Sequence, residues 1–313
     1  MRVAVVGAGL SGVACARQLH DDGHEVVVLD RGRVVGGRLA SRRLPDRDSR
    51  PVDLGASYLT ARDPGFQAQV DDWLSRGLLH PWTEHFAGQR GEGPLRYGSP
   101  RGLRSLVEDL AAPLDLRLST EVREVRGTSV DGQEYDAAVL ALPDPQAAAL
   151  LEPGTPAHQA VTGRAWEPVV VLAAGFVART WDLDGVFVHD DPVLSWVADD
   201  GTRRGDGAAV LTAHSTGGFA SAYALARPGA APPRDPVEAG PPMVAALRRQ
   251  LDLPEPVWTH VHRWSFARPA EGRDEPFWLA DRLGLCGDGW GTPRVETAWL
   301  SGRRLGERLS REG

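Results

Sequence analysis

Residues 3–12 read Val-Ala-Val-Val-Gly-Ala-Gly-Leu-Ser-Gly, an apolar strand that runs into three spaced glycines. Gly7 permits the tight turn from strand to helix, Gly9 lets bare backbone approach a pyrophosphate, and Gly12 lets the helix pack closely on the strand. A helix that begins near Leu10 points its unpaired amides and the positive end of its dipole at the phosphates. The stretch therefore predicts a Rossmann-type dinucleotide site.

The next segment completes this motif. The apolar strand Glu25 to Leu29 ends at Asp30, which lies 18 positions after Gly12. That distance is close to the spacing of roughly 20 residues at which an acid reaches the hydroxyls of a ribose. Because strand, helix and acid occur in the right order, nucleotide binding is favoured over a glycine-rich turn without a ligand.

Two later stretches indicate which dinucleotide is bound. Residues 36–38 read Gly-Gly-Arg and residues 53–57 read Asp-Leu-Gly-Ala-Ser. Both resemble the FAD-dependent amine oxidase superfamily, in which the first turn passes close to the cofactor and the second element lies near the flavin ring. Residues 138–143 resemble the strand and proline turn that such flavoproteins place against the cofactor domain. Taken alone, the two glycines would also fit a flexible surface loop.

The C-terminal stretch resembles the third part of an FAD site. A short strand, Leu283 to Cys286, precedes Gly287 and Asp288, and residues 293–299 open the last helix. In the resembled superfamily the aspartate bonds to the ribityl chain and the helix start lies beside the pyrimidine edge of the flavin. A helix N-terminus stabilises negative charge there by about 0.3 to 1 kcal/mol. Pro293 is expected in the first helical turn, where no amide donor is missed.

The likeness narrows to bacterial renalase-type flavoproteins through residues 53–63, 262–269 and 294–302. Such a resemblance implies oxidation of aberrant 2- or 6-dihydro-NAD(P). The hydride goes to flavin N5, NAD(P)+ is released, and oxygen takes the electrons to give hydrogen peroxide. Ser57, the pair Gly289-Trp290 and Thr297 depart from the usual pattern near the flavin. These departures leave a different substrate open.

The resemblance also implies which residues form the site. The implied FAD contacts are Gly7, Gly9, Leu10, Ser11, Gly12, Asp30, Arg31, Gly37, Arg38, Gly55, Ala56, Ser57, Val122, Gly287, Asp288, Arg294, Val295, Glu296, Thr297 and Ala298. The side chains expected to position the substrate are Tyr58, His262, Trp264 and Trp290, with Trp299 as a further ring beside the flavin. Ordinary core packing is the alternative for each ring, and a satisfied core hydrogen bond is the alternative for His262.

Cysteine and histidine usage bears on the cofactor and on metals. The only cysteines, Cys15 and Cys286, lie in segments expected to pack inside the dinucleotide domain, so neither a disulfide framework nor a zinc cluster is predicted. We therefore expect FAD to be bound noncovalently. His260 and His262 alternate on a predicted strand without a third ligand, so no metal is expected.

The chain contains no lysine, which excludes Schiff-base chemistry and a lysine general base. The lysine that monoamine and polyamine oxidases hold near the flavin is therefore missing, and this tells against an ordinary amine oxidase. Hydride transfer from a dihydropyridine needs no general base, because the ring nitrogen's lone pair drives it. Catalysis would then depend on alignment and electrostatic preorganisation.

Composition sets broader limits. The chain has 313 residues, 42% of them hydrophobic, a net charge of −7 and a pI near 5.7, which argues against a nucleic-acid surface. No apolar run reaches the roughly 18 residues of a membrane span. The first strand begins at Val3 and leaves no room for a signal peptide, so a cytoplasmic protein is expected. The expected partners are a small-molecule substrate and O2, without nucleic acid or membrane.

The predicted fold class is α/β, with a Rossmann-type FAD-binding domain of the glutathione-reductase or p-hydroxybenzoate-hydroxylase type and an interleaved, mainly antiparallel substrate domain. The first domain is predicted from residues 1–60, 100–155 and 275–313, and the second from 61–99 and 156–274. The predicted substrate-domain strands are 169–177, 186–188, 194–198, 208–214 and 257–266. Helices are predicted over 63–79 and 243–251, and a long loop over 227–242.

Three functions follow from these observations. A renalase-like FAD oxidase is the leading hypothesis. A flavin oxidase or desaturase acting on a small amine or secondary metabolite is the second, because of the departures near the flavin. A flavin-binding protein without turnover is the third. The choice of NAD or NADP, the physiological electron acceptor and the oligomeric state stay open.

Overall fold

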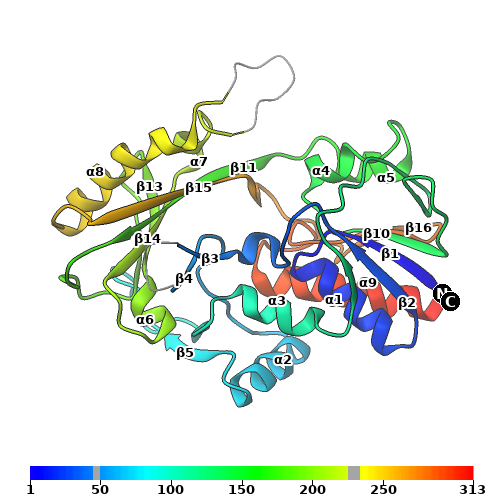
Figure 1. Ribbon diagram of the computed structural model, residues 1–313, viewed down its shortest axis with the longest axis horizontal. Helices are drawn as coiled ribbons and strands as arrows, with labels where there is room; N and C mark the ends of the chain where they lie inside the picture. Colours follow the sequence, from blue (N-terminus) through cyan, green and yellow to red (C-terminus); the bar gives the residue numbers. More distant parts are fainter. Residues whose placement is uncertain (45–49, 225–232, 313) are drawn as a thin grey trace.

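The chain folds around two large β-sheets that lie side by side along its long axis (Figure 1). A computed structural model describes residues 1–44, 50–224 and 233–312. Within these residues, no helix combines the length and the apolar character that crossing a membrane requires.

The first sheet carries the nucleotide-binding motif. In sheet order its strands are β16 (Trp278–Ala280), β17 (Leu283–Leu285), β10 (Ala137–Leu140), β1 (Arg2–Val6), β2 (Glu25–Leu29) and β7 (Asp115–Arg117). All neighbours are parallel except β16, which runs antiparallel to β17. The central strands β10, β1 and β2 are almost continuously apolar, as expected of strands covered on both faces, whereas the edge strand β7 carries the exposed Asp115 and Arg117. The predicted α/β fold with a Rossmann-type sheet is confirmed.

Helices α1 (Leu10–Asp21), α3 (Arg104–Ala111) and α9 (Val295–Glu312) cover one face of this sheet. A Cβ at Gly302 of α9 would lie 1.9 Å from the Ser11 carbonyl oxygen of α1, so the two helices pack backbone against backbone. The other face packs against the hairpin β8 (Val125–Arg126) to β9 (Ser129–Val130), α4 (Asp144–Ala148) and α5 (Pro156–Val161).

The second sheet is antiparallel throughout, as predicted. In order, its strands are β12 (Gly185–Phe187), β13 (Leu194–Asp199), β14 (Val210–Ser215), β11 (Trp166–Gly175) and β15 (Trp258–Pro269). Helix α8 (Gly240–Leu251) covers its outer face over an apolar core (Figure 1). The inner face contacts the strand pair β3 (Ser41–Arg43) and β4 (Pro51–Asp53), because Val52 and Leu54 pack against Val169 and Val171.

The remaining elements lie in the connections between the strands already described. They are the short helix η1 (Gly37–Leu39), α2 (Pro64–Ser75), the strand pair β5 (His80–Thr83) and β6 (Arg96–Gly98), α6 (Asp200–Arg204), α7 (Gly217–Ala220) and η2 (Pro236–Ala239). The division of the chain into two domains at the predicted boundaries stays a prediction.

Several predicted boundaries were wrong, among them those of β11, β14 and β15, and three of the differences are instructive. Helix α2 ends at Ser75 rather than residue 79, because Gly77 takes a φ of +67° and the Leu78 and Leu79 amides turn back to the Trp73 carbonyl. The loop predicted over 227–242 falls partly outside the described residues, and its end forms η2 and the first turn of α8. Pro293 precedes α9 instead of entering its first turn, since the Ala298 amide bonds to the Arg294 carbonyl.

Candidate functional site

The three glycines after β1 differ in what surrounds them. Gly7 has a φ of +111°, and a Cβ there would lie 2.6 Å from the Ala141 carbonyl oxygen. A Cβ at Gly12 would lie 2.0 Å from the Gly7 carbonyl oxygen. A Cβ at Gly9, by contrast, would meet no protein atom within 4 Å. Two glycines are thus required by packing, whereas Gly9 faces open space at the N-terminus of α1, where a cofactor phosphate would fit.

The acid after β2 lies beside this turn. Asp30 Oδ2 accepts a hydrogen bond from the Ala8 amide and Oδ1 accepts one from the Gly32 amide, both at 2.6 Å. The Asp30 carbonyl accepts the Thr120 amide at 2.9 Å, which brings the segment that leads to Val122 next to the acid. The Val122 side chain is buried, and Arg31 is exposed. This part of the predicted cofactor site is therefore assembled around Asp30.

Residues 36–38 and residues 53–57 both adjoin the glycine turn after β1. The Gly36 amide donates to the Ala8 carbonyl at 2.9 Å, and a Cβ at Gly37 would lie 3.3 Å from Gly9 Cα. A Cβ at Gly55 would lie only 1.9 Å from the Arg38 carbonyl oxygen, so this position also needs glycine. The Ala56 amide donates to that same carbonyl at 2.9 Å.

An ion pair joins the C-terminal stretch to these turns. The Arg38 guanidinium forms two parallel bonds to the Asp288 carboxylate, at 2.6 and 2.8 Å. Its Nη1 also donates to the Ala267 carbonyl at 3.1 Å, and its carbon lies 5.1 Å from the centre of the Trp166 ring. The Gly287 amide donates to Ser301 Oγ of α9 at 3.0 Å.

The start of α9 is fixed by an acid. The buried Glu296 accepts the amides of Arg62 and Asp63 at 2.6 and 2.8 Å, which ties α9 to the entry of α2. Thr297 Oγ1 donates to the Thr292 carbonyl at 2.5 Å. Of the other predicted contacts here, Arg294 is exposed, and Val295 and Ala298 are partly buried.

The inner face of the antiparallel sheet carries polar groups without partners. Trp196 of β13, His214 of β14, Val171 of β11 and His262 of β15 are in register, so they share this face. Thr212, two positions before His214, lies on the same face. Among the residues described, Thr212 Oγ1, His214 Nε2 and His262 Nε2 are buried atoms with no hydrogen-bond partner.

Two of the three histidines on this face, His214 and His262, are neutral at pH 7. Burial lowers the pKa of His214 to about 4, and the positive charges of Arg203 and Arg268 act in the same direction. Burial likewise lowers the pKa of His262 to about 4, helped by Arg42. Neutral imidazoles can orient a substrate through a donor or an acceptor nitrogen without adding charge.

An aromatic cluster borders this face at β13. Tyr58, Trp82, Phe86 and Trp196 form five ring pairs with centroids 4.7 to 6.1 Å apart. Ser57, one of the departures from the family pattern, accepts a hydrogen bond from Trp196 Nε1 at 2.9 Å. The structure thus connects the stretch predicted to lie near the flavin ring with the antiparallel sheet.

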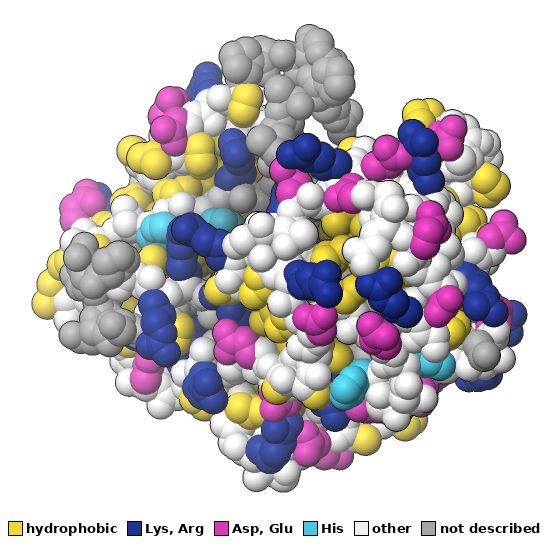
Figure 2. Space-filling model, turned by 45° about the vertical axis from the view of Figure 1, so that its right-hand side comes forward, with side chains coloured by type: hydrophobic (Ala, Val, Ile, Leu, Met, Phe, Trp, Pro, Cys, Tyr) yellow, Lys and Arg dark blue, Asp and Glu magenta, His cyan; other side chains and the backbone are white. Residues whose placement is uncertain are grey.

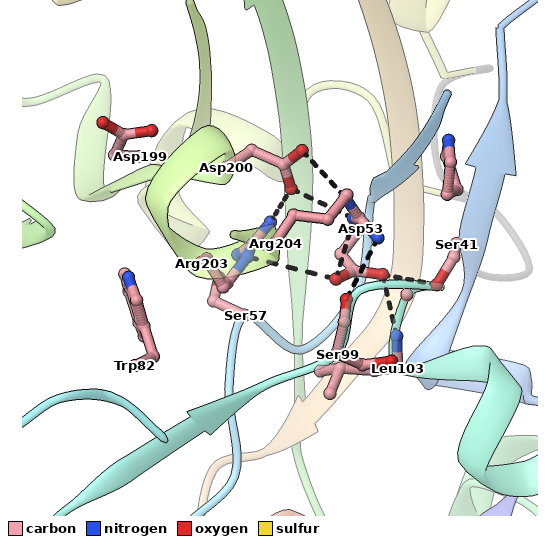
Figure 3. A network of polar contacts seen from close by, with 12 residues as sticks. Ser41, Asp53, Ser57, Trp82, Ser99, Leu103, Asp199, Asp200, Arg203 and Arg204 are labelled. Atoms are coloured by element: carbon pink, nitrogen blue, oxygen red, sulfur yellow. Dashed lines mark hydrogen bonds and ion pairs between the residues drawn. The ribbon is translucent and has the colours of Figure 1, made fainter. Parts of the chain in front are cut away.

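A buried network of charges lies between β4 and α6 (Figure 3). Asp53 bonds to Ser41 Oγ, accepts the Leu103 amide at 3.1 Å and pairs with Arg204 at 3.1 Å. Asp200 pairs with Arg203 and Arg204 within α6. Neither this network nor the polar pair Thr212 and His214 was predicted from the sequence. Two signals were available in the sequence. Arginines follow the acids at 199 and 200 at a spacing of three and four positions, and polar residues alternate along an apolar strand.

The structure separates the predicted substrate-side rings. Trp264 Nε1 donates to the Leu54 carbonyl at 2.6 Å, and the Trp264 ring lies 4.5 Å from that of His262. Trp290 is buried in the core on the α4 and α5 side of the parallel sheet. Trp299 packs at 5.3 Å against Phe66 in the core on the opposite side. Tyr58, His262 and Trp264 therefore lie near the inner face, whereas Trp290 and Trp299 pack as core residues.

The edge strand β15 opens this region to solvent. His260 and His262 of β15 are partly exposed, and Arg42 Nη1 lies 3.5 Å from His260 Nε2. Histidine and arginine side chains are visible together at a hollow on the face shown in Figure 2. A substrate could approach the inner face of the sheet from this edge.

The two thiols are buried and protonated. Burial raises the pKa of Cys286 to about 12 and that of Cys15 well above its ordinary value. Neither thiol is therefore suited to a covalent flavin bond. Across residues 1–44, 50–224 and 233–312, no group of three histidine, cysteine or acidic side chains could hold a metal ion.

Comparison with known proteins agrees with this geometry. Residues 5–74 match an NAD(P)-binding Rossmann-like domain, and residues 66–309 match the family of flavin containing amine oxidoreductases. Mouse (Mus musculus) renalase is 30% identical over 164 residues, which cover 46% of this chain and 48% of that protein. A flavin-containing monooxygenase, FMO GS-OX-like 2 of Arabidopsis thaliana, is 31% identical over 145 residues, which cover 42% of this chain and 29% of that protein. The chain spans about half, or less, of these curated relatives.

Solved structures share the fold over nearly the whole chain. Putrescine oxidase bound to putrescine superposes with a TM-score of 0.74 and 17% identity, covering 98% of both chains. Cyclohexylamine oxidase from Brevibacterium oxydans IH-35A superposes with a TM-score of 0.75 and 14% identity, covering 100% of this chain and 99% of the other. At this identity the likeness shows the fold alone. The family match covers most of the sequence and the glycine turns leave room for the cofactor, so the chain belongs to the flavin-containing amine oxidoreductase family and its cofactor is FAD.

Proposed function

We propose that this protein is an FAD-dependent oxidase that takes a hydride from 2- or 6-dihydro-NAD(P). In the net reaction the dihydronicotinamide, O2 and one proton give NAD(P)+ and hydrogen peroxide. Bound FAD supplies the two-electron acceptor that the protein itself lacks. The dinucleotide substrate is a cytoplasmic metabolite, and we propose a cytoplasmic location on that ground.

The observation that carries the proposal is the inner face of the antiparallel sheet. Two of its histidines, His214 and His262, are neutral at pH 7, and the whole chain has no lysine. Hydride donation from a dihydropyridine needs alignment and exclusion of water rather than a base. The aromatic rings and uncharged polar atoms of this face supply both. The 30% identity with mouse renalase supports the same class of reaction.

Specific residues are proposed to hold the cofactor. Gly9 and the first turn of α1 would accept the pyrophosphate, and Asp30 would accept the ribose hydroxyls. The ion pair of Arg38 and Asp288 would lie beside the ribityl chain of FAD, since this pair joins the two stretches that are predicted to flank the cofactor. Residues 53–57 and the start of α9 would flank the ring system.

A small amine is the second candidate substrate. The cluster of Tyr58, Trp82, Phe86 and Trp196 favours it, because aromatic faces attract ammonium groups. Putrescine oxidase and cyclohexylamine oxidase share the fold. Against it stands Arg96, whose guanidinium already lies 3.7 Å from the centre of the Phe86 ring.

Anaerobic mixing distinguishes the candidates. The purified holoprotein would be mixed with dihydro-NAD and dihydro-NADP isomers prepared with borohydride, and the flavin absorbance near its visible maximum would be followed. Rapid bleaching by the 2- or 6-isomers is expected, and readmission of oxygen should restore the colour with formation of hydrogen peroxide. Bleaching only by putrescine, cyclohexylamine or another metabolite would replace the proposal by the second candidate. No bleaching by any donor would indicate a flavin-binding protein without turnover.

A further inference from the structure

Arg203 of α6 is a buried cation that has two hydrogen-bond donors without partners. Its side chain is 1% exposed, its Nη2 pairs with Asp200, and its Nε lies 3.9 Å from Asp53 Oδ2. Its Nε and Nη1 have no hydrogen-bond partner. Buried donors in native proteins are nearly always satisfied, so donors of this kind point to an acceptor supplied by a ligand.

Two further unsatisfied groups lie on the strand that follows α6. Thr212 is 0% exposed, and its hydroxyl has no partner. His214 Nε2 is also buried without a partner, and the charge of Arg203 contributes to the lowered pKa of this imidazole. Trp196 stands beside His214 in the register of β13 and β14. The three unsatisfied groups therefore share one region, and an aromatic wall borders it.

We propose that Arg203, Thr212 and His214 form a polar subsite for an sp2 oxygen on a planar substrate, either a carboxamide carbonyl or a carboxylate. Arg203 and Thr212 would donate to that oxygen, and neutral His214 would bond to the remaining polar atom of the same group. The proposal rests on the proposed function for the identity of the substrate, since a nicotinamide ring carries such a carboxamide. The three side chains orient the ring and take no part in electron transfer.

The charges around the subsite give it selectivity. The fully buried charges of Asp53, Asp200, Arg203 and Arg204 cancel. Arg96 is 5% exposed and, within the described part of the chain, forms no ion pair, so it adds one positive charge beside the aromatic cluster. An uncharged or anionic ligand is therefore accepted, whereas an ammonium group would be repelled.

A titration of the holoenzyme tests the subsite without turnover. Benzamide, benzoate and benzylamine share a planar ring and differ in the charge and hydrogen bonding of one substituent. Each would be added to the FAD-loaded protein, and the dissociation constant would be taken from the perturbation of the flavin spectrum. Benzamide and benzoate should bind, and benzylamine should bind at least about tenfold more weakly, because it carries the wrong charge and no acceptor.

Thr212→Val is the diagnostic variant, because valine keeps the shape of the side chain and removes a hydroxyl that has no partner in the protein. The loss of one neutral hydrogen bond weakens benzamide binding by about 2- to 12-fold. The melting temperature should not fall, which separates ligand binding from a structural role. Thr259→Val is the matched control, since Thr259 lies on the exposed side of β15 and pairs with Ala174 of the outer-face core. It should change neither quantity.

Unchanged benzamide binding in Thr212→Val, or a tighter dissociation constant for benzylamine than for benzamide, would overturn the subsite. The result is independent of the dihydronicotinamide assay. If no dihydronicotinamide bleaches the flavin but benzamide binding and its loss in Thr212→Val are seen, the subsite stands and the proposed oxidase activity falls. If bleaching occurs and Thr212→Val binds benzamide normally, the activity stands and the subsite falls.

Discussion

Replacement of Gly9 by alanine should separate cofactor binding from folding. Gly9 precedes α1 with φ −77° and ψ 175°, which an alanine adopts without strain. The added Cβ meets no protein atom within 4 Å. The apoprotein should therefore keep its stability to within about 1 kcal/mol, with a small gain from the lower entropy of the unfolded chain.

The effect on FAD is worked out from the space that the methyl group fills. It would lie in front of the first turn of α1, where the amide groups have no partner within the helix. A phosphate pushed away from these donors loses charge-assisted hydrogen bonds, each with a net contribution of about 1.5 to 3 kcal/mol. One lost bond thus weakens FAD binding by about 10- to 150-fold.

Apoprotein would be titrated with FAD while the quenching of flavin fluorescence is followed, and thermal unfolding of the apoprotein would be measured in parallel. Two variants serve as controls. In Gly12→Ala the Cβ would lie 2.0 Å from the Gly7 carbonyl oxygen, so the apoprotein itself should be destabilised. Gly218 lies in α7, beside the antiparallel sheet, and in Gly218→Ala the Cβ meets nothing within 4 Å. The affinity for FAD and the stability of the apoprotein should therefore be unchanged.

One result would refute the reasoning directly. If Gly9→Ala unfolds like the wild type and binds FAD with the wild-type dissociation constant, no phosphate lies in front of Gly9. If the apoprotein of Gly9→Ala is destabilised as strongly as that of Gly12→Ala, the space at Gly9 is not open, and the affinity carries no information about the cofactor.

Three other predictions concern stability and the thiols. Glu296→Gln should lower the free energy of unfolding by about 1 to 3 kcal/mol in urea titrations, because two amides that bond to a charged carboxylate oxygen would then bond to a neutral one. Native protein should not react with a thiol reagent, whereas unfolded protein should expose two thiols, and acid precipitation should release all FAD into the supernatant. His214 has a folded-state pKa near 4, below the unfolded value of 6.5, so stability is lost as the pH falls through this interval. The loss between pH 7 and 4.5 should be smaller by about 2 kcal/mol in His214→Gln, as measured by urea unfolding at both pH values.

The cofactor half of the fold could be predicted because its determinants are local. Gly7 needs its positive φ, and Gly12 needs its missing side chain, within a stretch of ten residues that the sequence shows directly. Gly55 is a further example, because a Cβ there would lie 1.9 Å from the carbonyl oxygen of Arg38, which is only 17 positions earlier in the chain. Local conformational demands of this kind leave a clear signal in one sequence.

The sequence carries no such signal for the direction in which a side chain next to a motif points. Trp290 lies two positions after Asp288, and its ring turns into the core and stacks on the Arg273 guanidinium at 4.0 Å. Arg273 itself is held by a buried pair with Asp144, a residue far away in the sequence. Partners separated by so many residues cannot be matched from spacing, and the pairing of Asp53 with Arg204 escaped prediction for the same reason.

Residues 53–57 are tied to the cofactor side, where the Ala56 amide donates to the Arg38 carbonyl, and also to the substrate side. The Leu54 carbonyl accepts Trp264 Nε1, Ser57 accepts Trp196 Nε1, and Asp53 pairs with α6. Burying this ion network costs desolvation energy, so we infer that its contribution is to fix one position of the segment rather than to stabilise the fold. Since Arg203 belongs to the same network, a displacement of this segment by a poorly seated cofactor would also displace the proposed substrate subsite. Loading with FAD and shaping of the substrate side are therefore expected to be one coupled event.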